Sequence, residues 1–346
     1  MKKIDIIIPT YKDKQNLYPT LRSIGNNDSV QVVIVDDCSG TDFTDIIQEF
    51  QGHIDIITLS TPKNMGPGMA RQYGIDNSSS KYIIFMDCGD EFVTPESLND
   101  MLAEIEKTDF NIISFAHYQE NIDKSWDIVP PDNNRVHGKI YNRQFLQKYN
   151  IRFNPNCARV NEDIGFNMIC RLICNDLVNK HNLINGNMGF YEKPTVVWKF
   201  NENSLTKKNN CAFYYKEQNM GLAKNACYVI AQAKSNDVDE NDIENYAYDI
   251  FAYLYLYYLS TLHGRPEYLN EAFDGAFYFY HNYFGKLQYL DLDKLKYFFY
   301  NGLVALISDE NDPIRNEIIT INLYDFILMM QEKEKEISNS CVCEKN

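Results

Sequence analysis

The chain has 346 residues, a formal net charge of −15 and nine cysteines. This length allows one large domain and a smaller one, and the acidity argues against general nucleic-acid binding, which needs clustered Lys and Arg. The longest apolar run, near Ile250 to Leu259, is too short and too rich in Tyr to span a bilayer. Because Met1-Lys2-Lys3 leads directly into an apolar segment, no signal peptide is expected, and the scattered cysteines indicate a reduced, cytoplasmic protein.

Short apolar runs alternate with amphipathic ones up to about residue 120. The predicted strands are Ile4–Ile8, Gln31–Val35, Ile54–Leu59, Lys81–Met86 and Phe110–Phe115. The predicted helices between them are Lys14–Ile24, Thr41–Phe50, Pro67–Ile75 and Pro95–Lys107. This alternation predicts βαβ units, and therefore an α/β fold with a mostly parallel central sheet and helices on both of its faces.

The pattern loosens after Trp126, where Pro130-Pro131 predicts a loop, and a short helix is expected at Asn142–Tyr149. Helical periodicity resumes over Glu162–Leu177, and Thr195–Phe200 is predicted as a strand.

Residues 212–335 have the pattern of successive helices rich in Tyr, Phe and Leu. This change of character predicts a boundary near residue 207, between a domain of residues 1–206 and an all-α domain of residues 207–346. Tyr253 and Tyr257 occur at helical spacing and are expected in the core of that domain. The alternative is a sugar-stacking or subunit interface, which amphipathic Tyr also suits.

Polar residues follow three of the predicted strands. They are Pro9-Thr10-Tyr11, Asp36-Asp37, and Asp87 with Asp90. Because open α/β sheets bind ligands at the carboxyl ends of their strands, these positions predict a site for a polar, phosphate-bearing ligand. Asp87 and Asp90 suit a divalent cation such as Mg²⁺ or Mn²⁺, which takes oxygen ligands and bridges to phosphates. The alternative is that these acids only build surface turns.

Three later segments carry further candidate groups. They are the glycine-containing loop from Asn64 and Gly66 to Arg71, the acids Glu162-Asp163, and the segment from Lys199 to Ser204. A glycine-containing loop that leads into a helix can direct backbone N–H groups at negative charge, although a plain turn has the same sequence. Acids that open a helix are also ordinary capping residues. A cation and hydroxyls after a strand suit a pyrophosphate clamp or a solvated loop.

Taken together and in this order, these residues resemble the family 2 glycosyltransferases of the GT-A fold. The matching motifs are Ile6-Ile7-Ile8-Pro9-Thr10-Tyr11, Val35-Asp36-Asp37-Cys38-Ser39-Gly40-Thr41-Asp42, Asn64-x-Gly66, Ala70-Arg71-x-x-Gly74, Phe85-Met86-Asp87-Cys88-Gly89-Asp90, His137-Gly138-Lys139, Arg152-Phe153, Glu162-Asp163-x-x-Phe166 and Asn203-Ser204-Leu205-Thr206. The resemblance spans about residues 3–206. The helical remainder matches no particular family, but several family members carry helical additions that serve oligomerisation or acceptor binding.

The resemblance implies a Rossmann-like GT-A domain and a hexosyl transfer with inversion at the anomeric carbon. The donor would be a nucleotide-sugar, most often a UDP-sugar, and the acceptor a hydroxyl of a glycan or cell-surface polymer, as in polysaccharide biosynthesis. The protein is then expected in the cytoplasm or peripherally at the inner face of the membrane. A homo-oligomer formed through the C-terminal helices is also expected.

The resemblance also implies roles for individual residues. Asp163 would be the general base, with Glu162 orienting the acceptor, while Asp87 and Asp90 would hold Mn²⁺ or Mg²⁺. The residues expected to bind the nucleotide-sugar are Pro9, Thr10, Tyr11, Asp36, Asp37, Asn64, Gly66, Arg71, Asp87, Lys199 and Ser204. His137 and Lys139 are expected to contact the acceptor, although a structural role for His137 is an equal alternative.

One residue departs from the family pattern, because Gly89 stands where the family has the middle Asp of its Asp-x-Asp-Asp motif. Either Asp87 or Asp90 replaces that metal ligand, or the dependence on metal is weaker. A catalytically lapsed protein that still binds a nucleotide-sugar is the main alternative function. An acceptor outside the glycans, such as a modified nucleic-acid base, is another.

Overall fold

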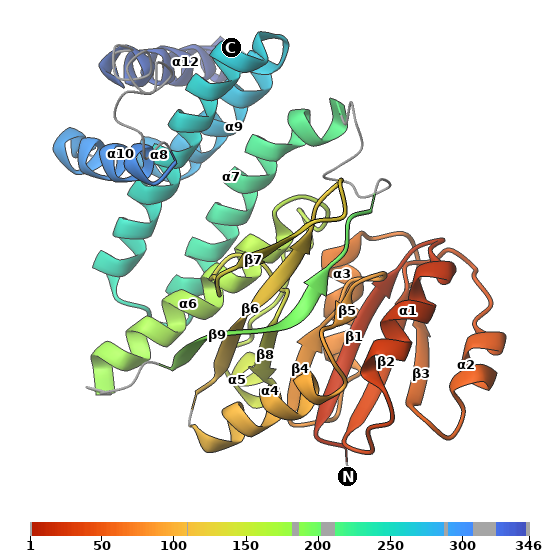
Figure 1. Cartoon of the computed structure of the whole chain (residues 1–346). Helices are drawn as coiled ribbons and strands as arrows, with labels where there is room; N and C mark the ends of the chain where they lie inside the picture. The colour runs from red at the N-terminus through yellow and green to blue at the C-terminus, as the bar shows by residue number, and fades with distance from the viewer. Residues whose placement is uncertain are drawn as a thin grey trace. The chain divides into compact units, whose positions relative to one another are not determined.

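The structure is a computed structural model that describes residues 2–108, 110–181, 187–201, 212–286, 290–306 and 323–343 (Figure 1). The chain divides into two compact units. Unit 1 is Met1–Asn209 with Gln232–Val238, and unit 2 is Asn210–Ala231 with Asp239–Asn346. The boundary predicted near residue 207 lies outside the described residues, so the division into domains 1–206 and 207–346 stays a prediction.

Unit 1 is built on a nine-stranded sheet, as far as the described residues show. Its strands are β1 (Ile4–Thr10), β2 (Val30–Asp36), β3 (Asp55–Ser60), β4 (Tyr82–Phe85), β5 (Glu91–Phe92), β6 (Ile112–Glu120), β7 (Trp126–Val129), β8 (Lys139–Asn142) and β9 (Met188–Trp198). The strand order is β3-β2-β1-β4-β8-β6-β9-β5, and β7 pairs with β6. The first four strands in this order are parallel, whereas β8 is antiparallel to both of its neighbours.

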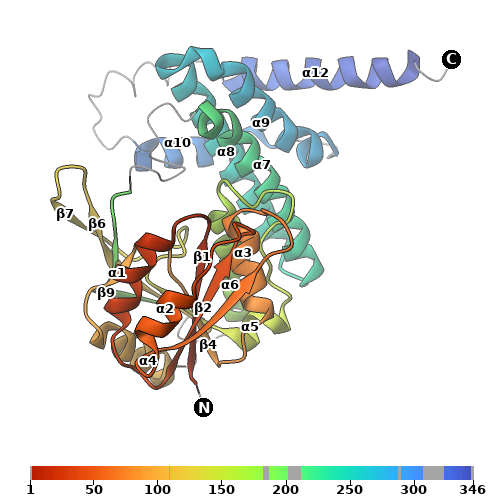
Figure 2. The ribbon, with the colours of Figure 1, turned by 90° about the vertical axis from the view of Figure 1, so that its right-hand side faces the viewer.

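Helices cover both faces of this sheet (Figures 1 and 2). The helices of unit 1 are α1 (Lys14–Ile24), α2 (Thr44–Phe50), α3 (Pro67–Asp76), α4 (Glu96–Lys107), α5 (Arg143–Lys148) and α6 (Glu162–His181). β1 is apolar along most of its length because a parallel strand covered on both faces buries nearly all of its side chains, and in β1 only Pro9 is half-buried. Ile4, Ile6 and Ile8 join one core cluster with Leu17 and Leu21 of α1, whereas Ile7 faces α3.

The structure confirms the predicted α/β fold and places the early strands and helices close to their expected positions. The sequence pattern did not predict β5, β7 and β8. Three of the four residues of β7 are exposed. Its sequence therefore lacks the alternation of buried apolar and exposed polar residues that predicts a strand. β8 contains a buried lysine, Lys139, which hides its interior position in the sequence.

Unit 2 is helical throughout its described residues, as predicted. Its elements are α8 (Glu240–Gly264), η1 (Pro266–Tyr268), α9 (Leu269–Asn282), η2 (Phe284–Lys286), α10 (Leu292–Leu306) and α12 (Leu323–Cys343), with the first part of α7 (Ala212–Ser235). Its core is aromatic, because Phe251 and Tyr255 of α8 pack against Phe326 with ring centroids 6.2 Å and 4.6 Å apart. The prediction that Tyr253 is a core residue is wrong, since 41% of this residue is exposed.

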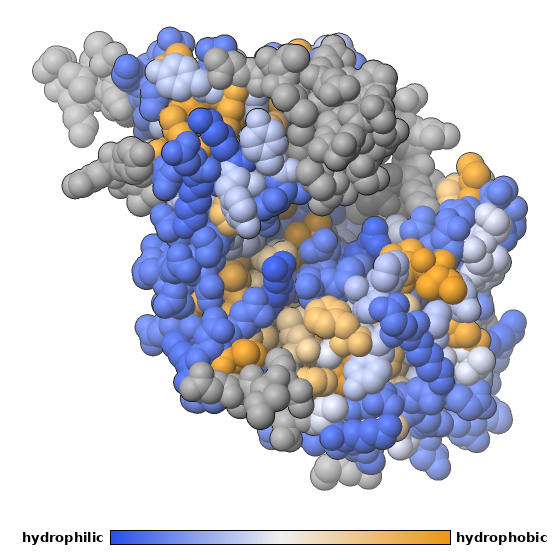
Figure 3. Space-filling model, turned by 60° about the vertical axis from the view of Figure 1, so that its left-hand side comes forward, coloured by the Kyte–Doolittle hydropathy of each residue, from blue (hydrophilic) through white to orange (hydrophobic). Residues whose placement is uncertain are grey.

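No helix within the described ranges is both long enough and apolar enough to cross a bilayer. Hydrophilic side chains predominate on the face of the molecule drawn in Figure 3, and hydrophobic ones gather there in separate patches.

The contact between α3 and β1 depends on Gly74. A Cβ atom at this position would lie 2.4 Å from Cγ2 of Ile7, which is fully buried. We therefore expect Gly74→Ala to lower the free energy of unfolding by about 1–3 kcal/mol, the usual cost of overpacking a core. Gly264→Ala is the control, because no atom lies within 4 Å of its Cβ position. Equal stability of the two variants in urea denaturation would contradict the close packing of α3 on β1.

Candidate active site

Two carboxylates lie on a tight turn that directly follows β4. The backbone N–H of Asp90 donates to the carbonyl of Asp87 at 3.0 Å, and Gly89 between them has a φ of 102°. This conformation is open to glycine and strained for residues with a Cβ atom. The Gly89 N–H also donates to Oγ1 of Thr20 at 3.0 Å. The glycine that interrupts the expected acidic motif is therefore a requirement of this turn.

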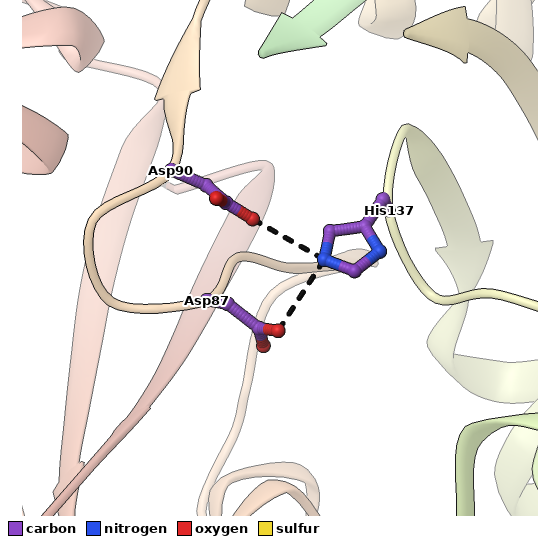
Figure 4. Close-up of side chains that lie close together, drawn as sticks. All are labelled: Asp87, Asp90 and His137. Atoms are coloured by element: carbon purple, nitrogen blue, oxygen red, sulfur yellow. Dashed lines mark ion pairs between the residues drawn. The ribbon is translucent and has the colours of Figure 1, made fainter. Parts of the chain in front are cut away.

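The turn brings Asp87 and Asp90 to the imidazole of His137 (Figure 4). Nε2 of His137 lies 3.3 Å from Oδ2 of Asp87 and 3.2 Å from Oδ2 of Asp90. Burial lowers the pKa of His137, but the two carboxylates outweigh it and raise that pKa to about 10. Burial would raise the pKa of Asp87, yet Arg71 and His137 hold it well below its usual range. The pKa of Asp90 is raised, chiefly by burial.

Gly138 allows His137 to reach these acids. Its φ is 62°, and its carbonyl accepts the N–H of Phe115 on β6 at 2.8 Å. A Cβ atom at Gly138 would lie 2.9 Å from the carbonyl oxygen of Phe115, so only glycine lets the loop before β8 run this close to β6. Trp198 of β9 then packs on His137, with ring centroids 5.3 Å apart.

The donor set of these three side chains fits a divalent cation. One ligand atom from each of Asp87, Asp90 and His137 lies within 4.8 Å of the others, and this is the group of three such residues found in the described part of the chain. Oδ2 of Asp90 and Nε2 of His137 are buried and make no well-formed hydrogen bond there. Carboxylates suit hard cations such as Mg²⁺ and Mn²⁺, and an imidazole is a common ligand of transition metals, so the mixed set is compatible with a divalent cation.

Arg71 connects this group to the start of α6. Its Nη2 bonds Oδ1 of Asp87 at 2.6 Å, and its Nη1 bonds Oε1 of Glu162 at 2.9 Å. The guanidinium is buried, and the two carboxylates hold its pKa above its usual value despite that burial. The single side chain of Arg71 therefore fixes the distance between the acidic turn after β4 and the acids of α6.

Glu162 and Asp163 occupy the first turn of α6, where the helix dipole favours negative charge. Glu162 is buried, and burial together with Asp163 raises its pKa to about 7, against the effect of Arg71. Burial also raises the pKa of Asp163, with Arg71 and His137 opposing. Among the described residues Asp163 makes no salt bridge, and its Oδ1 accepts only the N–H of Ile164. Asp163 is therefore the less constrained carboxylate of the two.

An aromatic cluster packs between the end of β4 and the first turns of α6. Phe153 stacks on Phe166 of α6 with centroids 4.2 Å apart, and Phe85 at the end of β4 meets Phe166 edge-on at 5.8 Å. Tyr141 of β8 completes the cluster, and its hydroxyl donates to Oδ1 of Asn167 at 2.8 Å. These contacts hold the end of β4 and the first turns of α6 in a fixed relation.

Gly66, which precedes α3, and Gly68, in its first turn, serve packing inside the protein. A Cβ atom at Gly66 would lie 2.7 Å from Cγ of Arg159, and one at Gly68 would lie 2.8 Å from Cγ of Glu162. The segment before α6 therefore fills the space on the Cβ side of Gly66. The expected approach of the Gly66 backbone to the donor stays a prediction. Asn64 also contacts this segment, since its side-chain oxygen accepts a hydrogen bond from Arg159.

The two acids after β2 build the adjoining loops. Asp36 accepts the N–H groups of Ser39 and Gly40 at 2.9 Å and 3.1 Å. Asp37 accepts those of Met65 and Gly66 at 2.8 Å and 2.7 Å. Both carboxylates are almost fully buried and hold the backbone of these loops. Contacts between these acids and a nucleoside stay a prediction.

The remaining donor candidates lie on both sides of the acidic turn. Tyr11 is 47% exposed, Thr10 is buried against Cys88, and Pro9 is half-buried in β1. The N–H of Lys199 donates to Oδ1 of Asp90 at 3.0 Å, but its ammonium lies 3.4 Å from Glu120. Ser204 lies outside the described residues. Tyr11 is thus the exposed ring at this edge of the sheet.

Lys139 does not lie where an acceptor could reach it. It is 1% exposed, and its Nζ bonds Oδ1 of Asp132 at 3.0 Å and the carbonyl of Arg135. Burial lowers its pKa, with Asp132 opposing. We therefore correct its expected contact with the acceptor to a role inside the loop that precedes His137. His137 itself lies beside Asp87 and Asp90, a position that the sequence did not predict.

His137 provides a test of the metal site. With a pKa of about 10 it is protonated at neutral pH, and a cation can bind Nε2 only after that proton leaves. We expect Mn²⁺ binding to release one proton, and its affinity to rise about tenfold per pH unit between pH 6 and 8. Calorimetry in buffers of different ionisation enthalpy measures the released proton. Unchanged proton release in His137→Ala would contradict the assignment.

The family comparison and two relatives agree on one class of protein. A family model described as Glycosyl transferase family 2 matches residues 5–164. Poly(ribitol-phosphate) beta-N-acetylglucosaminyltransferase TarS from Staphylococcus aureus strain Mu50 is 27% identical over 112 residues, 31% of this chain and 19% of that protein. UDP-Glc:alpha-D-GlcNAc-diphosphoundecaprenol beta-1,3-glucosyltransferase WfaP from Escherichia coli is 30% identical over 142 residues, 39% of this chain and 54% of that protein. Each match thus covers less than two thirds of the relative's length.

A solved structure shares the fold over most of the chain. The crystal structure of S. aureus TarS 1–349 in complex with UDP superposes with a TM-score of 0.62 and 16% sequence identity. The match covers 96% of this chain and 91% of that one. At this identity the likeness shows the fold alone.

Proposed function

We propose that this chain, which belongs to glycosyltransferase family 2 through its residues 5–164 and has the GT-A fold, transfers a sugar from a nucleotide-sugar to an acceptor hydroxyl with inversion. A UDP-sugar is the proposed donor, because the matching TarS structure was solved with UDP. The proposed acceptor is a cell-surface polymer or a lipid-linked glycan. The names of both relatives describe acceptors of that kind.

One observation carries the proposal. Asp87, Asp90 and His137 converge at the carboxyl end of β4, and Arg71 ties them directly to the acids that open α6. A sugar transferase needs a group that neutralises the leaving diphosphate and a base for the attacking hydroxyl. The end of the Arg71 bridge at Asp87 would serve the leaving diphosphate, and the end at Glu162 would serve the attacking hydroxyl.

The donor half would be built by the acidic turn and His137. A cation bound to Asp87, Asp90 and His137 would neutralise charge on the diphosphate as the glycosidic bond breaks. Gly89 does not remove this function, because His137 brings a third ligand atom to the two carboxylates. Tyr11 offers an exposed ring on which a nucleobase could stack.

The acceptor half would be the first turn of α6. Asp163 is the proposed general base, because its carboxylate has no ion-pair partner among the described residues and its pKa is raised by burial. A raised pKa makes the ionised carboxylate a stronger base. Arg71 occupies one oxygen of Glu162, so the proposed role of Glu162 is to orient the acceptor and the Arg71 bridge.

Other expectations from the sequence remain proposals. A cytoplasmic or peripheral location suits a protein that takes a UDP-sugar to a surface polymer. The helical region of unit 2 is proposed to serve oligomerisation or acceptor binding.

Asp163→Asn tests the base. The amide keeps the shape of the side chain but accepts no proton, so we expect turnover to fall by about 10²–10⁴-fold. Mn²⁺-dependent UDP affinity should stay within about twofold of the wild type, because Asp163 is not among the proposed metal ligands. Asp28→Asn, at an exposed position, is the matched control. Release of UDP from a UDP-sugar measures turnover, and full activity of Asp163→Asn would remove Asp163 as the base.

A further inference from the structure

The loop that precedes His137 is fixed by an ion pair between the buried Lys139 and the partly buried Asp132. Oδ1 of Asp132 accepts the N–H groups of Asn134 and Arg135 at 2.7 Å and 2.9 Å, and it also pairs with Nζ of Lys139 at 3.0 Å. Oγ of Ser114 on β6 donates to the carbonyl of Asp132 at 3.0 Å. Since Lys139 also bonds the carbonyl of Arg135, the backbone of residues 132–135 is held from both sides.

This loop is attached to the helix turn that carries the proposed base. Nδ2 of Asn167 donates to the carbonyl of Asn134 at 3.1 Å and to that of Asp163 at 3.0 Å. Asn167 is fully buried, and the hydroxyl of Tyr141 fixes its amide. Residues 132–135 therefore lie on the Asp163 side of the site, where the acceptor is proposed to bind.

The loop presents one cation, Arg135, beside the site. The guanidinium of Arg135 lies over the ring of Trp198 at 5.4 Å, and the same ring packs on His137 at 5.3 Å. The side chain of Arg135 is 40% exposed, whereas that of Lys139 is 1% exposed. Both cations face the carboxylate of Asp132, Arg135 at 3.6 Å and Lys139 at 3.0 Å, so these three groups carry one net positive charge. Of the two cations, Arg135 is the one exposed to solvent.

We propose that Arg135 binds a phosphate group of the acceptor, close to the hydroxyl that Asp163 deprotonates. A planar guanidinium held against an aromatic ring is suited to phosphate oxygens, which it contacts through paired N–H groups. The donor diphosphate is assigned to the acidic turn and His137, whereas Arg135 is fixed to α6 through Asn134 and Asn167. This inference rests on the proposed function and narrows the acceptor to phosphate-bearing chains, such as polyol phosphates or diphosphate-linked glycans.

The test compares a charged probe with its uncharged counterpart. Glycerol 3-phosphate and glycerol are titrated by NMR against wild type, Arg135→Gln and the control Arg22→Gln, with and without saturating UDP and Mg²⁺. Arg22 pairs with Glu49 on the exposed surface of α1 and has no part in the site. We expect wild type and Arg22→Gln to bind glycerol 3-phosphate but not glycerol. Arg135→Gln should bind the phosphate at least about tenfold more weakly.

A second arm separates the acceptor from the donor. The affinity of Arg135→Gln for UDP should equal that of the wild type, and a parallel loss of UDP affinity would make Arg135 a donor residue and overturn the inference. Equal binding of glycerol 3-phosphate by wild type and Arg135→Gln would also overturn it. Failure of the wild type to bind UDP would contradict the proposed function instead, while the titrations without UDP would still decide the role of Arg135.

Discussion

The buried bridge from Asp87 through Arg71 to Glu162 is the interaction on which the site depends. Arg71 lies on α3, which packs tightly on β1 through Gly74. Its side chain pairs with Asp87 after β4 and with Glu162 on α6. The Arg71–Glu162 pair is buried, and removing one partner of a buried ion pair typically costs about 3–5 kcal/mol, because the other charge is left unpaired. The side chain of Asp87 is 36% exposed, so its pair with Arg71 is partly screened by solvent. The bridge is thus both a structural tie and a source of electrostatic coupling between the two halves of the site.

Three glycines and one lysine show how the surrounding chain supports this bridge. Gly66 and Gly68 leave room for the segment that leads into α6, so that Glu162 can meet Arg71. Gly138 lets the loop before β8 run against β6, which turns His137 toward the acids. Lys139 is buried beneath that loop and fixes the backbone on which Arg135 stands. In each case the residue supports the position of a neighbouring side chain.

The sequence predicted the parts of the fold that rest on local pattern. Apolar runs with helices between them place β1 to β4 and α1 to α4 almost correctly, because parallel strands buried on both faces are continuously apolar. Acids at the ends of these strands mark the candidate site, because open α/β sheets bind ligands at the carboxyl ends of their strands. The pattern fails for β7, which is exposed, and for β8, which begins with a buried lysine.

The roles of His137 and Lys139 could not be predicted because both depend on strand order. β8 lies between β4 and β6 although it follows both in the chain, and only this order brings His137 to Asp87 and Asp90. A histidine followed by glycine after a loop was the available signal, and it did not distinguish a metal ligand from an acceptor contact.

Metal-dependent UDP binding is the measurement that tests the account most directly. UDP is titrated by calorimetry with and without Mn²⁺ into wild type, Asp90→Asn and the control Asp28→Asn. The account predicts that Mn²⁺ increases UDP affinity in wild type and in the control, and that Asp90→Asn loses at least about tenfold of the affinity seen with Mn²⁺. A UDP affinity that changes neither with Mn²⁺ nor with the Asp90→Asn substitution would contradict a donor site at Asp87, Asp90 and His137. The absence of any UDP binding would contradict it as well.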